Sequence, residues 1–163
     1  MTVGIDTMLL DLPVRRFLQD PLRILEEIGL RRTHRFLDVG CGKGFLTIPA
    51  ASIVGDSGIV YAVDVSDYNL SVLRRRVSEL RLSNVKILKT SGELLEGVPH
   101  RAIDRAAYLF SLHHLADIRK SLETLRTKLA DGALVYVLDP IGPRLLGHTA
   151  FNWSIRYVSA TVV

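Results

Sequence analysis

Cysteine is almost absent from the sequence, since Cys41 is the only one among 163 residues. A single cysteine cannot form an intrachain disulfide, and it excludes a zinc site built from several thiolates. Long apolar runs are missing too, because none reaches the roughly 18 residues that a membrane helix needs. The first residues, MTVGIDTMLLDLP, carry acids early and lack a basic segment before an apolar one. We therefore expect no signal peptide, no membrane span, no metal and a cytoplasmic location.

Charge of one sign is only slightly in excess, with a net charge of +4. Such a balance can attract phosphate groups, but it also fits ordinary solvated helix faces, which is the simpler explanation. The basic residues concentrate in the N-terminal half, at Arg15, Arg16, Arg23, Arg31, Arg32, Arg35, Arg74, Arg75 and Arg76.

The length and the 48% hydrophobic content suit one domain with a real core. We expect a single domain over residues 1–163. Within it, residues 1–34 form an N-terminal helical lid segment, 35–140 a cofactor-binding core and 141–163 a shortened C-terminal tail.

Strand and helix patterns alternate along the chain. This order predicts an α/β fold, a Rossmann-like, doubly wound and mostly parallel sheet with helices on both faces. The near-continuous apolar strands agree with burial on both faces. Strands are expected at 35–39, 58–65, 85–89, within 103–112 and at 133–139, and helices at 22–30, at 45–54, after Ser66 and at 118–132.

Two of these helices show a clear apolar face. The helix capped by Ser66 repeats apolar residues at spacings of three and four. The helix over 118–132 is expected to end at Gly132. The predicted inward residues are Leu70, Leu73, Val77 and Leu80 in the first helix and Leu122, Leu125 and Leu129 in the second.

Three glycines, Gly40, Gly42 and Gly44, separate the first strand from the helix that follows. A dinucleotide site needs the pattern G-x-G-x-x-G, but here the third glycine comes one residue early. Asp38, before the loop, suits an ammonium group better than a pyrophosphate. Asp64, at the end of the second strand, can accept both hydroxyls of a ribose in either ligand class. The competing explanation is a tight packing turn.

Four segments, LDVGCGKG, VYAVDVS, IDRAAYLFSLHHL and LADGALVYVLDP, resemble in this order the motifs of class I S-adenosylmethionine-dependent methyltransferases. The resemblance covers residues 14–140 and is greatest for the small-molecule group that includes quinone-biosynthesis methyltransferases. It implies S-adenosyl-L-methionine as the cofactor. It also implies in-line transfer of a methyl group to a small-molecule or lipid-like acceptor.

The resemblance also implies which residues bind the cofactor. The loop would approach the methionine part, and Asp38 would hold its amino group through water. Asp64 would bind the ribose, and Val65 and the turn after the third strand would lie against the adenine. Many relatives have an aspartate where Ser91 stands, and Glu93 is the candidate to replace it. The implied cofactor residues are Asp38, Gly40, Cys41, Gly42, Gly44, Asp64, Val65, Ser91, Gly92, Glu93 and Leu109, with Phe110 beside Leu109 near the sulfonium.

Catalytic residues are less clear. Cys41 lies in a loop turned toward the cofactor, so we do not expect it to be a nucleophile. His113 and His114 follow the fourth strand, where ligands bind, and either could act as a general base or simply begin a helix. Arg15 and Arg16 could bind the cofactor carboxylate or remain solvated.

Alternatives remain for the acceptor and for the tail. A tRNA or protein methyltransferase is the second hypothesis, although nucleic acid is disfavoured, and a module inactive without a partner subunit is the third. Relatives add a helix and a two-strand hairpin after the fifth strand, whereas only 23 residues follow Pro140 here. The segment 151–163 is expected to be one strand that either covers its own sheet edge or joins two copies in a homodimer, which we favour.

Overall fold

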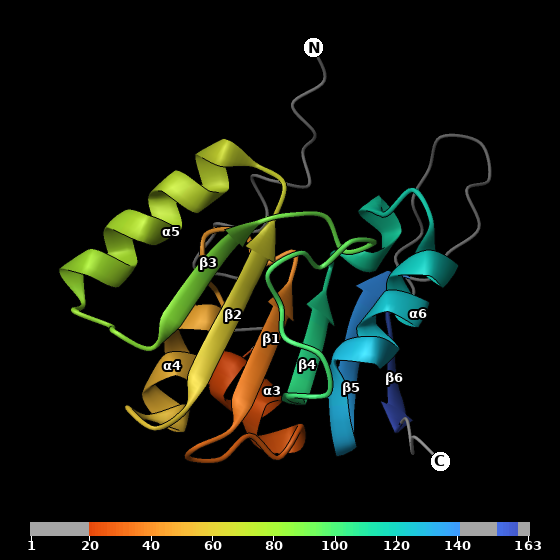
Figure 1. Ribbon diagram of the computed structural model, residues 1–163, viewed down its shortest axis with the longest axis horizontal. Coiled ribbons are helices and arrows are strands. Elements are labelled where there is room, and N and C mark those ends of the chain that lie inside the picture. The colour runs from red at the N-terminus through yellow and green to blue at the C-terminus, as the bar shows by residue number, and fades with distance from the viewer. Residues whose placement is uncertain (1–19, 141–152, 160–163) are drawn as a thin grey trace.

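The computed structural model describes residues 20–140 and the backbone of residues 153–159. These residues form a sheet in the order β3-β2-β1-β4-β5-β6 (Figure 1). The first five strands are parallel and β6 is antiparallel, which confirms the mostly parallel, doubly wound prediction. The strands are β1 (Arg35–Val39), β2 (Ile59–Asp64), β3 (Val85–Lys89), β4 (Ile103–Leu109), β5 (Leu129–Pro140) and β6 (Trp153–Ser159). The helices are α3 (Pro21–Glu27), α4 (Thr47–Val54), α5 (Asp67–Glu79), the short 3-10 turn η1 (Leu112–His114) and α6 (Ile118–Lys128).

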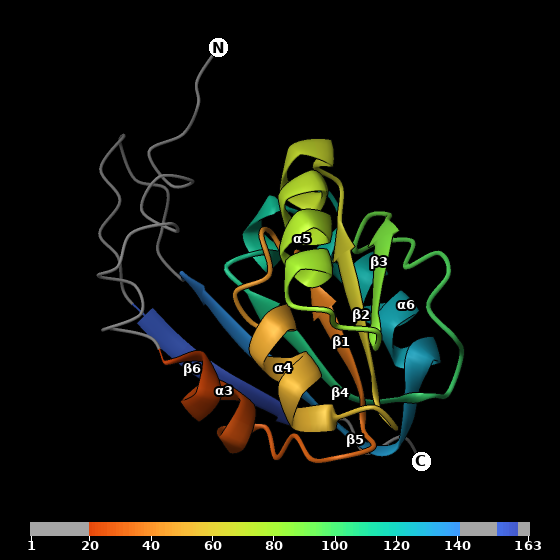
Figure 2. The same cartoon turned by 90° about the vertical axis from the view of Figure 1, so that its left-hand side faces the viewer.

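Helices cover both faces of the sheet. Figure 2 shows α3, α4 and α5 on one side and α6 on the other. Successive strand residues point to opposite faces, so Phe36 packs in the cluster that contains Ala50 of α4. Its neighbour Leu37 packs in the cluster that contains Leu125 of α6. The two-sided burial explains why the strands are apolar almost throughout.

Local sequence signals set where three of the helices begin. Ser66 caps α5 by accepting a hydrogen bond from the backbone N–H of Asn69. Pro49 lies in the first turn of α4, where its missing N–H costs no intrahelical bond. Asp20 caps α3 in the same way as Ser66 caps α5, by accepting from Leu22.

The prediction for α6 was wrong at its end and on part of its face. The helix ends at Lys128, and Leu129 already pairs with Ile103 as the first residue of β5. Gly132, with φ of 73°, lies inside β5 where the register with β4 shifts. The sheet-facing residues of α6 are Ser121, Leu125 and Lys128, which places Leu122 on the outer side at 43% exposure.

Leu80 was also predicted to be buried but is 55% exposed. It is the C-cap residue of α5, beyond the last turn that packs on the sheet. Leu70 and Leu73 are fully buried, as predicted, and Val77 is partly buried against the same cluster.

The tail covers its own sheet edge. Strand β6 pairs with β5 from Leu134 opposite Ser159 to Pro140 opposite Trp153. The predicted last strand is therefore confirmed in the first of its two alternatives, while the homodimer stays a prediction. Residues 1–19, with Arg15 and Arg16, lie outside the described residues, as do 141–152 and 160–163. The role of residues 1–34 as a lid likewise stays a prediction.

Candidate functional site

The predicted site residues gather at the carboxyl edge of the sheet. Strand β1 lies between β2 and β4, and the chain order reverses at the β1–β4 pair. The connections from these two strands leave toward opposite faces, and in open α/β sheets ligands bind outside the carboxyl ends of such a pair. The glycine loop and the turn at residues 109–114 lie at this point of the sheet, because they follow β1 and β4 directly.

Two glycines of the loop are required by packing within the protein. A Cβ on Gly40 would lie 2.3 Å from the Cβ of Ser111, and one on Gly44 would lie 2.5 Å from Cδ1 of Leu73. The backbone N–H groups of Gly40 and Cys41 both donate to the carbonyl of Val63, over 2.8 and 2.9 Å. Gly40 and Gly44 therefore have a packing role, and their predicted contacts with the cofactor stay predictions.

Gly42 is different, since a Cβ there would meet nothing within 4 Å. Its φ of 53° is left-handed, and its N–H donates to Oδ2 of Asp64 over 2.9 Å. The other oxygen of Asp64, Oδ1, accepts from the N–H of Ser66 over 2.8 Å. A carboxylate has about four acceptor sites. Asp64 therefore keeps capacity for two ligand hydroxyls beside an open stretch of backbone.

Asp38 is held inside the protein at the start of α4. Its side chain is 2% exposed, and its Oδ2 accepts from the hydroxyl of Thr47, the first residue of α4, over 2.6 Å. The N-terminal end of a helix favours a negative charge. Thr47 escaped the sequence analysis, although a threonine opening the helix after a glycine loop was a usable signal.

Cys41 is buried within the loop. Burial raises the pKa of its thiol far above its usual range, and the negative charges of Asp38 and Asp64 add to this effect. A thiol in this state remains protonated and is a poor nucleophile. The structure therefore agrees with the expectation that Cys41 does no catalytic chemistry.

An exposed apolar surface adjoins Asp64. Val65 follows it directly and is 64% exposed, and Tyr68 is 66% exposed. The ammonium of Lys43 lies 5.2 Å from the centre of the Tyr68 ring. This surface beside a carboxylate has the chemistry that a nucleoside needs, an apolar platform for the base and acceptors for the ribose.

The turn at 91–93 packs against α6. The hydroxyl of Ser121 donates to the carbonyl of Gly92 over 2.8 Å, and Oε1 of Glu93 accepts from the N–H of Ala116 over 2.9 Å. Burial alone would raise the pKa of Glu93, but hydrogen bonds from backbone N–H groups and from Ser91 outweigh it and lower the pKa. Glu93 thus joins two loops, and its predicted contact with adenine stays a prediction.

The end of β4 carries a strained residue. Phe110 has a φ of 53°, which a bulky side chain rarely adopts, and its N–H donates to the carbonyl of Leu138 over 2.8 Å. The hydroxyl of Ser111 donates to the carbonyl of Val39 over 2.6 Å. Leu109 and Phe110 are 8% and 9% exposed. Strain of this kind is typical of functional sites, and here bonds to both neighbouring strands maintain it.

His113 is paired with a carboxylate that the sequence analysis did not single out. Its Nδ1 lies 2.5 Å from Oδ1 of Asp139, at the end of β5. Asp139 is 6% exposed, whereas the side chain of His113 is 36% exposed. The His114 ring lies 3.9 Å from that of His113, centre to centre. The sequence could have indicated Asp139, because this residue ends the predicted fifth strand in LADGALVYVLDP and so lies at the carboxyl edge of the sheet.

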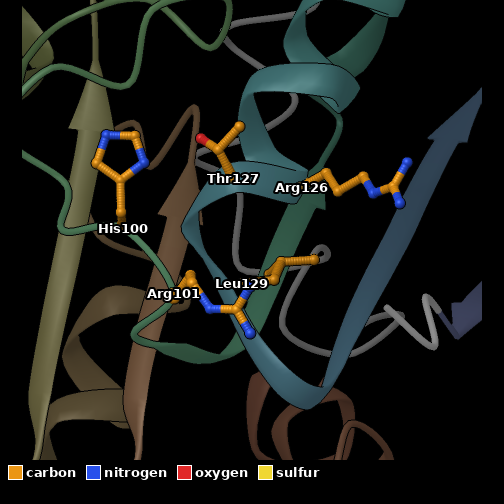
Figure 3. Close-up of a pocket in the computed structure, with 5 residues that line it drawn as sticks. All are labelled: His100, Arg101, Arg126, Thr127 and Leu129. Atoms are coloured by element: carbon orange, nitrogen blue, oxygen red, sulfur yellow. The ribbon is translucent and has the colours of Figure 1, made fainter. Parts of the chain in front are cut away.

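A separate hollow of about 370 Å³ lies at the opposite edge of the sheet (Figure 3). Its residues come from the segment before β4 and from the junction of α6 and β5. One of them, Arg101, forms an ion pair with Asp131 over 3.1 Å. No predicted site residue lines it. The lining residues are His100, Arg101, Arg126, Thr127 and Leu129.

Within residues 20–140, no cluster of three or more His, Cys, Asp or Glu has the arrangement of a metal site. None of the helices that the structure describes has the length and hydropathy needed to cross a membrane.

Comparison with known proteins gives consistent matches. The profile of the ubiE/COQ5 methyltransferase family matches residues 7–157. A demethylmenaquinone methyltransferase of Geobacillus sp. (strain WCH70) is 29% identical over 133 residues, covering 82% of this chain and 56% of the relative. Aklanonic acid methyltransferase DauC of Streptomyces sp. (strain C5) is 29% identical over 107 residues, covering 66% of this chain and 48% of the relative. The chain spans about half the length of these curated relatives.

Among solved structures, a SAM-dependent methyltransferase from Aquifex aeolicus superposes with a TM-score of 0.76 and 32% identity. The match covers 83% of this chain and 71% of that one.

Proposed function

The chain belongs to the ubiE/COQ5 methyltransferase family, and from this premise we propose that it transfers a methyl group from S-adenosyl-L-methionine to a small organic acceptor. The observation that carries the proposal is the open backbone of Gly42 beside Asp64, whose carboxylate keeps free acceptor sites. A dinucleotide is less suitable, because a pyrophosphate on the glycine loop would meet the negative charge of Asp38.

The residues at this edge suit each part of the cofactor. Asp64 would accept the ribose hydroxyls, and Val65, whose side chain is exposed, would lie against the adenine. Asp38, fixed by Thr47, provides negative charge for the amino group. When bound, the cofactor supplies an electrophilic methyl group on a positively charged sulfur. Leu109 and Phe110 are buried apolar residues at the end of β4 and would lie near that sulfur.

The acceptor is proposed from the relatives. Two of them are named for demethylmenaquinone and aklanonic acid, so we assign this chain an acceptor of the quinone or polyketide kind. Within residues 20–140, no contact favours a tRNA or protein acceptor. Because the chain spans about half of these relatives, a module that needs a further segment or a partner is the second candidate.

Two remaining predictions belong to this proposal. A homodimer through the tail would have to form beside or in place of the β5–β6 pairing within one chain. The single cysteine supports a reducing compartment such as the cytoplasm.

Ligand binding tests which cofactor the protein uses. S-adenosylmethionine and its demethylated product should raise the melting temperature, because they bind only the folded state, whereas NAD should not. Transfer of a labelled methyl group to lipid and small-molecule extracts then tests the activity. Equal shifts with NAD would contradict the cofactor, and binding without transfer to any extract would favour the module.

A further inference from the structure

His113 and Asp139 form a pair that is built by the tertiary structure. The histidine follows β4 and the aspartate ends β5, and these strands are neighbours in the sheet. Oδ2 of Asp139 accepts from the backbone N–H groups of Leu112 and His113 over 2.7 and 3.3 Å. Oδ1 lies 2.5 Å from Nδ1 of His113. The carboxylate is therefore held in one orientation by two backbone donors and directs its other oxygen at the ring.

This arrangement selects one form of the neutral imidazole. An ionised carboxylate only accepts hydrogen bonds, so Nδ1 must carry the hydrogen. Nε2 then carries a lone pair, which makes it the basic atom of the ring. Within residues 20–140 the structure gives Nε2 no hydrogen-bond partner. The ring is thus partly exposed and keeps its basic nitrogen without a partner in these residues, while the carboxylate of Asp139 is buried.

A purely structural role does not require the ring contact. Asp139 could cap the η1 turn through Oδ2 alone, with any side chain at position 113. The pair instead places a proton acceptor at the carboxyl edge, next to Phe110 and Ser111. Within the described residues, two titratable groups contact the His113 ring, Asp139 at the end of β5 and His114 in the same η1 turn.

We infer that His113 is the general base of the proposed methyl transfer and that Asp139 is its positioning residue, with a hydroxyl of the acceptor already proposed as the group that loses the proton. The inference rests on the proposed function. The O–H bond of the acceptor breaks, its proton forms a bond to Nε2, and the electron pair stays on the acceptor. This pair makes the oxygen or a conjugated ring carbon nucleophilic toward the methyl group, whose bond to sulfur breaks with its electrons remaining on sulfur. The proton passes from Nε2 to water, as does the hydrogen of the ring carbon when carbon is methylated.

Among possible acceptor groups, a hydroxyl needs such a base most. A neutral amine has a lone pair before it reacts, and a thiol ionises readily near neutral pH, so neither needs a paired histidine as much as a hydroxyl does. General-base catalysis contributes about 10²–10⁴ in rate. The hydroxyl-bearing reduced quinones are therefore the acceptors to test first.

The first experiment determines, without any substrate, which nitrogen of the His113 ring carries the hydrogen. Nitrogen-15 spectra of labelled histidines in the full chain at neutral pH should show His113 with hydrogen on Nδ1 and a lone pair on Nε2. D139N should remove this preference. Hydrogen on Nε2 in the unsubstituted protein would overturn the inference, whether or not the methyl transfer is found.

The second experiment uses 1,4-dihydroxynaphthalene as the acceptor. H113Q should lower kcat by about 100-fold or more, leave the affinity for S-adenosylhomocysteine within about twofold, and regain rate at alkaline pH as the hydroxyl ionises unaided. H100Q, at the opposite edge of the sheet, is the matched control and should keep the rate. An unchanged rate in H113Q, or a loss of rate that alkaline pH does not restore, would overturn the assignment of His113 as the general base.

The controls separate the two proposals. A protein that does not bind S-adenosylhomocysteine would refute the proposed function, and the spectra would still report on the pair. A protein that binds it and methylates an amine or thiol, but not the naphthalenediol, would show that the acceptor group is not a hydroxyl. That result would overturn the role of His113 as the base.

Discussion

Gly40 packs so closely on Ser111 that a Cβ on the glycine would lie 2.3 Å from the Cβ of the serine. The hydroxyl of the same serine donates to the carbonyl of Val39, just before the loop. The end of β1 is thereby fixed against the turn that follows β4. Gly42, two residues on, has open space above it. The loop thus combines a glycine needed for packing with one beside open space, where we propose that the cofactor binds.

Alanine substitutions should separate these two roles. Gly40→Ala should destabilise the protein strongly, because a left-handed residue costs about 1–2 kcal/mol and the contact with Ser111 adds to it. Gly42→Ala carries the backbone cost alone but fills the ligand space, so it should weaken S-adenosylhomocysteine binding by about tenfold. Urea unfolding and calorimetry measure both. Equal stability of the two variants would contradict this assignment.

Asp64 should matter for both affinity and stability. Asp64→Ala removes the acceptor of two ribose hydroxyls and should cost roughly 2–4 kcal/mol of cofactor binding. It also leaves the N–H groups of Gly42 and Ser66 without their partner, so the unfolding free energy should fall as well. The exposed acid Asp56 provides the matched control in Asp56→Ala. Unchanged affinity in calorimetry would show that Asp64 does not bind the ribose.

Cys41 should be chemically inert in the folded protein. Its pKa is raised by burial, and thiol reagents attack the thiolate. Labelling with a disulfide reagent at neutral pH should therefore proceed only as fast as the protein unfolds, and become rapid in urea. Stoichiometric reaction within seconds under native conditions would show that the thiol is accessible.

Glu93 should make stability depend on acid. Its folded pKa lies below the ordinary value of 4.5. Its contribution is therefore fully present above that value and is lost as the pH falls through the lower folded pKa. Glu93→Gln should reduce stability at neutral pH and flatten this acid loss, as measured by urea unfolding at several pH values. Glu123→Gln, on the exposed side of α6, should change neither.

The tail should protect the edge of β5. Strand β6 pairs with this edge from Leu134 to Pro140, so its removal exposes unpaired backbone groups. Deletion of residues 150–163 should cause aggregation, or loss of a dimer if one forms, in light scattering. Deletion of residues 160–163 alone keeps the paired residues and is the control. A stable monomer that binds S-adenosylhomocysteine after the longer deletion would show that the tail is dispensable.

The sequence by itself determined the strands, the loop between β1 and α4, and the N-terminal cap of α5. These features depend on short-range rules, namely apolar periodicity, glycine spacing and a serine before a helix. The same rules failed at Leu122 and at the end of α6. Sheet-facing positions on this helix are Ser121, Leu125 and Lys128, and the rotation of a helix is decided by what it packs against.

Only the tertiary structure decided which residues act together. Asp38 meets Thr47 because α4 folds back over the end of β1. Asp139 meets His113 because β5 lies beside β4, although 26 positions separate them. Contacts of this kind follow from strand order and from the way the chain crosses the sheet, which no local pattern encodes. The sequence could therefore place His113 at the right edge, and the fold alone supplied the carboxylate that orients it.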